Sequence, residues 1–229
     1  MKQSLELLES LKSGLIVSCQ APVNSPLHDP LVIAAMAKAA LNGGAVGVRI
    51  DTPAHVAGVR QNIGKFPIIG LWKQQISGFE VYITPRFADA VAIATAGADI
   101  IAIDGTLRPR PNGESLSNLI KKIHQELGKL VMADVDTMAS ASAAVEAGAD
   151  ILGTTLYGYT ADTSYFSPPG WNLLSEMLSR FSIPVICEGG VASPQMAVQA
   201  LQLGAYAVVI GNAITGIDQK VEQFRAVFP

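Results

Sequence analysis

The sequence has 229 residues, of which 49% are apolar and only 15% are charged, and its formal net charge is −3. Its length lies within the usual range for one (β/α)8 barrel, and the apolar content suits a buried parallel sheet. The slightly acidic charge argues against a nucleic-acid partner, and no apolar segment is long enough to cross a membrane. We therefore predict one domain over residues 1–229.

The two cysteines, Cys19 and Cys187, have no CxxC spacing and no histidine cluster beside them. Neither a zinc site nor a disulfide framework is indicated. Glu6 and Glu9 lie in an amphipathic N-terminal run, which lacks the basic and then apolar pattern of a signal peptide. These features predict a reduced, cytoplasmic setting.

Eight short apolar runs alternate with helical patterns along the chain. A lead-in helix over residues 4–11 carries leucines at helical spacing and is expected to cover the bottom of a barrel. The expected strands are 14–18, 45–50, 66–71, 99–103, 130–133, 150–155, 184–187 and 205–210. Helices are expected over 31–41, after Thr52-Pro53, from Thr84-Pro85 to residue 96, and over 117–127, 140–147, 171–181 and from Ser193-Pro194. This rhythm is typical of parallel βα units.

A glycine-containing segment recurs before every second strand, at 42–45, 96–99, 147–150 and 203–206. Each glycine can adopt the left-handed conformation that ends a helix. An open doubly wound sheet remains possible, but it gives no reason for a repeat on alternate strands. The repeat favours a (β/α)8 barrel built from four two-unit modules.

Polar residues lie at the C-terminal ends of nearly all expected strands, and in a barrel these strand ends converge at one mouth. They are Gln20, Arg49, Lys73, Asp104, Asp134 with Asp136, Thr155, Glu188 and Asn212. Each one taken alone could be an ordinary loop residue. A polar group after nearly all eight strands indicates a binding or catalytic site.

Lys73 and Glu188 are the sharpest candidates. Lys73 follows Trp72, where partial desolvation favours the neutral amine that a base needs, although it could also be an exposed lysine. Glu188 follows an apolar strand and could act catalytically or pair with Arg49. Strands three and seven of an eight-strand ring lie opposite each other. An acid and a base on two sides of one carbon are what inversion of a C–H centre requires.

Asp134 and Asp136 flank one valine in an extended stretch, so their side chains point to opposite sides. Only one of them can face the mouth, and we favour Asp134. A metal site from Asp104 and Asp134 is not favoured, because no histidine cluster or further acid accompanies them.

Glycines end the last two expected strands, at Gly189-Gly190 and Gly211-Asn212. Backbone N–H groups there can face an anion without a Cβ in the way, and a helix N-terminus behind them adds partial positive charge. Because barrels usually bind phosphate after strands seven and eight, we predict a phosphate site formed by these four residues.

The sequence resembles the N-acetylmannosamine-6-phosphate 2-epimerase family over nearly its whole length. The resemblance rests on the segments 14–21, 47–50, 70–73, 81–85, 102–106, 132–137, 153–160 and 188–190. It implies a barrel of the ribulose-phosphate-binding type, a phosphosugar substrate, no cofactor and no metal, and a homodimer. The implied reaction interconverts N-acetylmannosamine 6-phosphate and N-acetylglucosamine 6-phosphate in sialic acid catabolism. The family's catalytic lysine and glutamate match Lys73 and Glu188, and its sugar-contacting residues match Gln20, Arg49, Asp134 and Tyr157.

One departure and several alternatives remain. Gly216-Ile217 stands where many relatives carry a basic residue followed by proline, so phosphate affinity or the placement of the last helix is expected to differ. Lys73 could serve both faces of the sugar alone. A different phosphosugar enzyme that forms a Schiff base on Lys73, or a non-catalytic phosphosugar-binding protein, would share the same scaffold.

Overall fold

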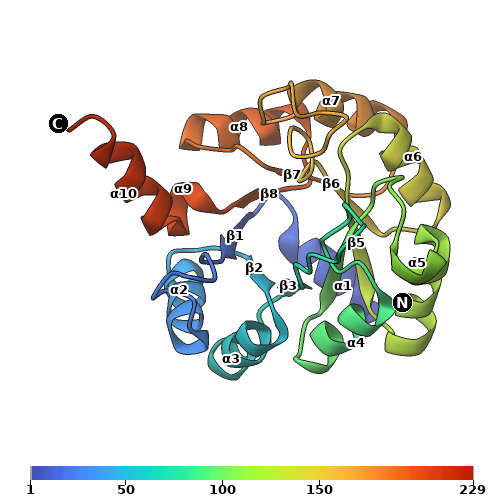
Figure 1. Ribbon diagram of the computed structural model, residues 1–229, viewed down its shortest axis with the longest axis horizontal. Helices are drawn as coiled ribbons and strands as arrows, with labels where there is room; N and C mark the ends of the chain where they lie inside the picture. The colour runs from blue at the N-terminus through green and yellow to red at the C-terminus, as the bar shows by residue number, and fades with distance from the viewer. Residues whose placement is uncertain (1, 229) are drawn as a thin grey trace.

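The computed structural model describes residues 2–228, and its centre is a closed barrel of eight parallel strands (Figure 1). Each strand pairs with the next one in sequence, and β1 pairs with β8 to close the ring. The strands are β1 (Leu15–Cys19), β2 (Gly47–Asp51), β3 (Ile68–Leu71), β4 (Ile100–Asp104), β5 (Leu130–Asp134), β6 (Ile151–Gly153), β7 (Val185–Glu188) and β8 (Ala207–Ile210). The predicted fold class and all eight predicted strands are confirmed.

Helices surround the barrel and follow its strands in order (Figure 1). They are α1 (Lys2–Leu11), α2 (Pro30–Asn42), α3 (Pro53–Ile63), α4 (Phe87–Thr95), α5 (Leu116–Lys122), which continues into the π-helical turn η2 (Ile123–Leu127), α6 (Met138–Glu146), α7 (Trp171–Arg180), α8 (Pro194–Leu203), α9 (Asn212–Thr215) and α10 (Ile217–Arg225), with a short 3₁₀ turn η1 (Pro111–Gly113). No helix within residues 2–228 is both long and apolar enough to cross a membrane.

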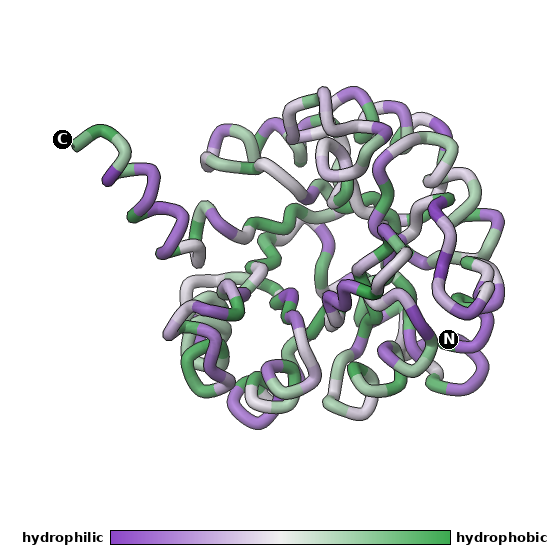
Figure 2. Tube along the Cα trace, viewed as in Figure 1, coloured by the Kyte–Doolittle hydropathy of each residue, from purple (hydrophilic) through white to green (hydrophobic). Residues whose placement is uncertain are grey.

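Two apolar layers hold the barrel together. Ile101 and Ile103 of β4 point outward into the layer shared with the helices, whereas Ile100 and Ala102 point into the barrel. Leu11 of α1 is fully buried in the inner layer and so covers the bottom of the barrel, as predicted. Hydrophobic residues accordingly concentrate along the strands in Figure 2. This alternation follows from the two-residue period of a strand.

The repeated glycines end helices in the predicted way. Gly44, Gly97, Gly148 and Gly204 have φ angles of 98°, 109°, 94° and 106°. These values are in the left-handed region that residues with a Cβ rarely adopt. Each glycine therefore turns the chain from an even-numbered helix into the following even-numbered strand.

The start of α4 differs from the prediction. Thr84 was expected to cap this helix, but Arg86 occupies the N-cap position and Thr84 has φ 44°. The Thr84 hydroxyl instead accepts a hydrogen bond from the backbone N–H of Trp72 at 3.0 Å, and Ile83 forms a bridge with Lys73. Residues Ile83 and Thr84 thus pair with the chain that follows β3, and Thr84 does not cap α4. It lays the segment Val81–Thr84 across the mouth of the barrel.

The C-terminal helix α10 lies away from the barrel wall (Figure 1). None of its residues is buried. The apolar side chains of Ile217, Val221 and Phe224 are 53%, 61% and 70% exposed. Because residues at this spacing lie on one helix face, α10 presents an uncovered apolar stripe.

Candidate functional site

A cavity of about 430 Å³ opens at the carboxyl ends of the strands. It is lined by most of the predicted site residues, namely Gln20, Arg49, Lys73, Glu188, Gly189, Gly190, Gly211 and Asn212. The barrel topology explains this convergence, because the C-terminal ends of all eight parallel strands meet at one face. Asp134 and Tyr157 are the two predicted site residues that do not line the cavity.

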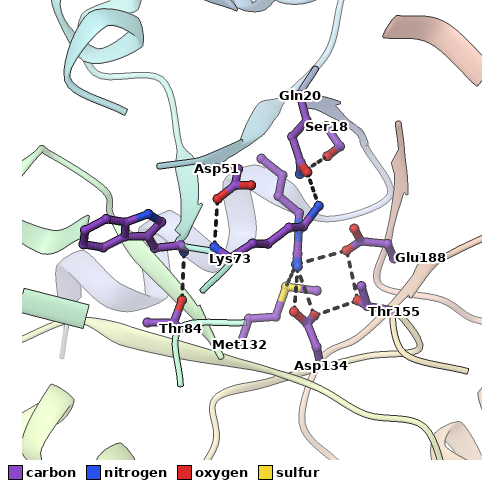
Figure 3. A network of polar contacts seen from close by, with 11 residues as sticks. Ser18, Gln20, Asp51, Lys73, Thr84, Met132, Asp134, Thr155 and Glu188 are labelled. Atoms are coloured by element: carbon purple, nitrogen blue, oxygen red, sulfur yellow. Dashed lines mark hydrogen bonds and ion pairs between the residues drawn. The ribbon is translucent and has the colours of Figure 1, made fainter. Parts of the chain in front are cut away.

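Lys73 is held at the mouth from both its backbone and its side chain (Figure 3). Its backbone N–H donates to Asp51 at 2.9 Å, and its ammonium donates to Oε1 of Gln20 at 2.5 Å. Gln20 in turn donates through Nε2 to the Ser18 hydroxyl at 2.7 Å. Among residues 2–228, the ammonium group therefore has one hydrogen-bond partner, and that partner is neutral.

Arg49 is the buried charge at the centre of the site. Only 2% of its surface is exposed, and its two terminal nitrogens donate to the two oxygens of Asp134 at 3.1 and 2.6 Å. Nη1 also lies 3.1 Å from Oε2 of Glu188. Burial disfavours the charged guanidinium, but the charges of Asp134 and Glu188 outweigh burial and raise the pKa of Arg49. Arg49 therefore stays cationic.

Glu188 has an unusual protonation equilibrium. Burial raises the pKa of Glu188 to about 7, the charge of Arg49 opposes that shift, and the charge of Asp134 adds to it. The Thr155 hydroxyl lies 2.6 Å from Oδ1 of Asp134 and 3.1 Å from Oε2 of Glu188 (Figure 3). One hydroxyl hydrogen cannot be donated to both oxygens. When Thr155 donates to Asp134, a protonated Glu188 can donate to Thr155, so the geometry accommodates both protonation states.

Lys73 and Glu188 approach the centre of the mouth from two sides (Figure 3). Lys73 follows β3 and Glu188 ends β7, and these strands are four positions apart in the closed ring. The two groups are close enough for the charge of Lys73 to lower the pKa of Glu188, although by less than burial raises it. A ligand in this cavity would thus lie between an amine and a carboxyl group.

Asp134 lies beneath the cavity lining and contacts residues that line it. It is fully buried, and its contacts are with Arg49 and Thr155. Asp136 points the other way, where it accepts hydrogen bonds from Ser140 and Thr160 at 2.7 and 2.8 Å. The predicted alternation of these two carboxylates is confirmed, but a direct contact of Asp134 with a ligand in the cavity does not fit its burial.

The structure places Tyr159, and not Tyr157, at the cavity. Tyr157 stacks on Phe166 with ring centroids 5.3 Å apart and packs on Gly170, where an added Cβ would come within 2.8 Å of the tyrosine ring. The loop between β6 and α7 has no regular period, so the sequence could not show which tyrosine turns inward.

Other lining residues are not among those predicted from the sequence. Tyr82 lies on the segment that crosses the mouth, between the buried residues Val81 and Ile83. That alternation was the available signal. Burial, together with the charges of Asp134 and Asp104, raises the pKa of Tyr82 to about 12, so its hydroxyl remains a donor at neutral pH. Ser18 and the α10 residues Gln219, Lys220 and Gln223 also line the cavity.

The two glycine loops contribute backbone to the cavity lining. Gly189 and Gly190 have φ angles of 96° and 70°, and a Cβ at Gly190 would lie 2.6 Å from the backbone of Pro168. Within residues 2–228, the N–H groups of Gly190 and Val191 donate to no protein acceptor. Gly211 and Asn212, which follow the neighbouring strand β8, line the same cavity. These N–H groups can therefore receive an anion.

The metal-ligand types do not gather in the described part of the chain. Over residues 2–228 no group of three or more His, Cys, Asp or Glu side chains could hold a metal ion. The carboxylate of Asp104 accepts hydrogen bonds from Thr106 at 2.6 Å and Arg108 at 2.8 Å. Asp104 is the register partner of Asp134 on the neighbouring strand, but its two oxygens are already occupied by these donors.

Similarity to known proteins extends over nearly the full chain. Residues 33–228 match the family described as "Putative N-acetylmannosamine-6-phosphate epimerase". Relatives carrying the corresponding 2-epimerase name include one from Thermosynechococcus vestitus, 60% identical with 97% of this chain and 96% of the relative covered, and one from Enterobacter sp. strain 638, 42% identical with 96% and 94% covered.

A solved structure agrees with these relatives. The N-acetylmannosamine-6-phosphate 2-epimerase from Clostridium perfringens superposes with a TM-score of 0.92 at 37% identity, and the match covers 97% of this chain and 96% of that one. Fold, length and sequence thus point to the same family, and the resemblance noted in the sequence is confirmed. The chain belongs to the N-acetylmannosamine-6-phosphate 2-epimerase family.

Proposed function

We propose that the protein inverts C2 of N-acetylmannosamine 6-phosphate to give N-acetylglucosamine 6-phosphate, as a step of sialic acid catabolism in the cytoplasm. Family membership supports the substrate and the reaction. The single observation that carries the chemistry is the approach of Lys73 and Glu188 from two sides of the cavity. A binding protein needs the glycine loops but has no use for such a pair.

The proposed reaction is a proton exchange at C2 of the open-chain sugar. The C2–H bond breaks, its proton moves to the base, and the electron pair delocalises onto the oxygen of the C1 carbonyl group. A proton then adds to C2 from the opposite face and restores the carbonyl group. General acid–base catalysis of this kind needs groups that can both hold and release a proton near neutral pH. Glu188, whose pKa is raised to about 7, satisfies that condition.

The other polar residues support that exchange. Arg49 would stabilise the negative charge that develops on the sugar oxygen, because it is cationic, buried and already oriented. Asp134 would position Arg49, and Gln20 would position Lys73 and contact the sugar. In place of Tyr157, Tyr159 is the tyrosine that could contact the ligand.

The phosphate would bind at the glycine loops, to the backbone of Gly189, Gly190, Gly211 and Asn212. The unengaged N–H of Gly190 and the fit of that glycine against Pro168 support this assignment. An anchored phosphate fixes the distance of C2 from both catalytic groups, which is the main benefit of orientation in catalysis.

We also propose that the protein acts as a homodimer in which α10 of one copy covers an apolar groove of the other. The groove has a volume of about 480 Å³ and is lined by residues that include Pro194, Ala197, Leu201, Val208 and Ile214. It lies over β8 and α8, where the helix after β8 of a barrel ordinarily packs. The exposed apolar stripe of α10 has matching chemistry.

Proton NMR of N-acetylmannosamine 6-phosphate with the protein in D2O tests the proposed reaction. Loss of the C2 proton signal together with the appearance of the gluco epimer is expected. No exchange and no new sugar, with protein shown to be folded by circular dichroism, would remove the epimerase proposal.

A further inference from the structure

The first turns of α10 reach the cavity although the helix leaves the barrel. Gln219, Lys220 and Gln223 line the cavity together with Gly189, Gly190 and Asn212. These three α10 residues lie at one-turn spacing and so share a face, whereas the apolar stripe of α10 lies on another face. α10 is therefore both a wall of the cavity and a carrier of exposed apolar residues.

Gly216 explains how α10 comes back to the glycine loops. A Cβ at this position would lie 2.8 Å from the Cα atom of Asn212 and 2.8 Å from the side-chain oxygen of Gln219. The backbone of Gly216 thus packs directly against the loop after β8. This close approach keeps the first turn of α10 beside Asn212, and Lys220 of that turn lines the cavity.

Three cations line the cavity, and two of them have partners. Arg49 donates to Asp134 and contacts Glu188, and Lys73 donates to Gln20. Lys220, half-buried, forms no ion pair or side-chain hydrogen bond with residues 2–228. The part of the cavity that residues 2–228 describe thus holds an ammonium without a partner and N–H groups without acceptors, and both are donors that suit a dianion.

We propose that Lys220 binds the substrate phosphate and is the residue by which the protein discriminates a phosphorylated amino sugar from its unphosphorylated form. This inference rests on the proposed function, because the phosphorylated sugar is its substrate. A lysine suits the role, since its ammonium is a compact point charge that needs no fixed plane. The backbone N–H groups orient the phosphate, and Lys220 supplies the full positive charge that the glycine loops lack.

The test compares Lys220→Met with Lys220→Arg and with Lys121→Met. Methionine keeps the apolar stem of the side chain and removes the charge, and Lys121 is an exposed lysine of α5 outside the cavity. We expect Lys220→Met to raise KM for N-acetylmannosamine 6-phosphate by about 10- to 100-fold with kcat changed little, because it removes a charged hydrogen bond to a group remote from C2. Lys220→Arg should recover most of the affinity, and Lys121→Met should match the wild type.

Binding of inorganic phosphate, measured by calorimetry, separates this inference from the proposed function. Phosphate that binds the wild type and Lys121→Met, and binds Lys220→Met at least tenfold more weakly, supports the role of Lys220 even if no epimerisation is seen. A KM and a phosphate affinity of Lys220→Met within twofold of the wild type would overturn it while leaving the epimerase proposal intact. Failure of the wild type to bind phosphate would also overturn it.

Discussion

Nη1 of Arg49 and Oε2 of Glu188 lie 3.1 Å apart, although the same guanidinium is already paired through both terminal nitrogens with Asp134. Two carboxyl groups therefore share one buried cation. Since a single positive charge cannot fully compensate two negative charges in a buried site, one carboxyl group retains its proton more readily. Glu188, whose pKa is raised to about 7, is that group.

The neighbours of Glu188 should shift its pKa in opposite directions. The charge of Asp134 raises the pKa of Glu188, so Asp134→Asn should lower it. The hydrogen bond from Thr155 lowers it, so Thr155→Val should raise it. Carbon NMR of glutamate-labelled protein would follow the Glu188 carboxyl signal, with Glu188→Gln to assign it. Shifts of the same sign in both variants would contradict this account.

The stability of the protein should depend on Glu188 between pH 4.5 and 7. The pKa of Glu188 in the folded state lies above the ordinary glutamate value of 4.5, so the folded state binds the proton more tightly and stability falls as pH rises through this window. The contribution amounts to at most about 3 kcal/mol, at about 1.36 kcal/mol for each pH unit by which the pKa is raised. Urea denaturation at several pH values should show a steeper fall for the wild type than for Glu188→Gln. Parallel stability curves for the two proteins would exclude the effect.

Lys73→Ala should reduce turnover by more than about 10³-fold while leaving ligand binding largely intact, because a proton-transfer group is lost and the phosphate contacts remain. The measurement is exchange of the C2 proton in D2O, paired with calorimetric binding of the sugar phosphate. Near-normal exchange would remove Lys73 from the mechanism. Trapping of a covalent adduct on Lys73 by borohydride would instead favour Schiff-base chemistry.

Gly190→Ala should destabilise the protein by more than about 2 kcal/mol, since it combines a left-handed φ with a steric clash against Pro168. Gly113→Ala is a matched control, because Gly113 has φ 66° and a Cβ added there would meet no atom within 4 Å. It should cost only about 1 kcal/mol. Equal costs in urea denaturation would show that close packing at Gly190 is unimportant.

The sequence predicted what depends on the period of the strands and on barrel geometry. Residues within or just after the C-terminal halves of β2, β3 and β7 meet at one mouth because all strands of the barrel are parallel, and the alternation of Asp134 and Asp136 follows from the two-residue period of a strand. The features that the sequence did not predict depend on tertiary contacts that override local signals. The Thr-Pro pair at Thr84 is a local signal for the start of α4, but Thr84 accepts a hydrogen bond from Trp72 and the helix begins later.

Irregular segments account for the other differences. The loop that carries Tyr157 and Tyr159 has no period from which an inward direction could be read. The course of α10, which brings Lys220 to the cavity, depends on the packing of Gly216 on Asn212 and leaves no signature in helical spacing.

The apolar stripe of α10 gives the last prediction, which concerns assembly. A stripe containing Val221 and Phe224 costs free energy while it faces water, and covering it in the groove of a second copy removes that cost. Phe224→Asp should therefore convert a dimer into a monomer by light scattering after gel filtration. Gln223 lies one position away on the cavity face, so Gln223→Asp adds the same charge to the same helix and should leave the dimer intact. A wild-type protein that is monomeric at micromolar concentration would contradict the proposed homodimer, whereas dissociation by both variants would assign the effect to charge on α10 and not to its apolar face.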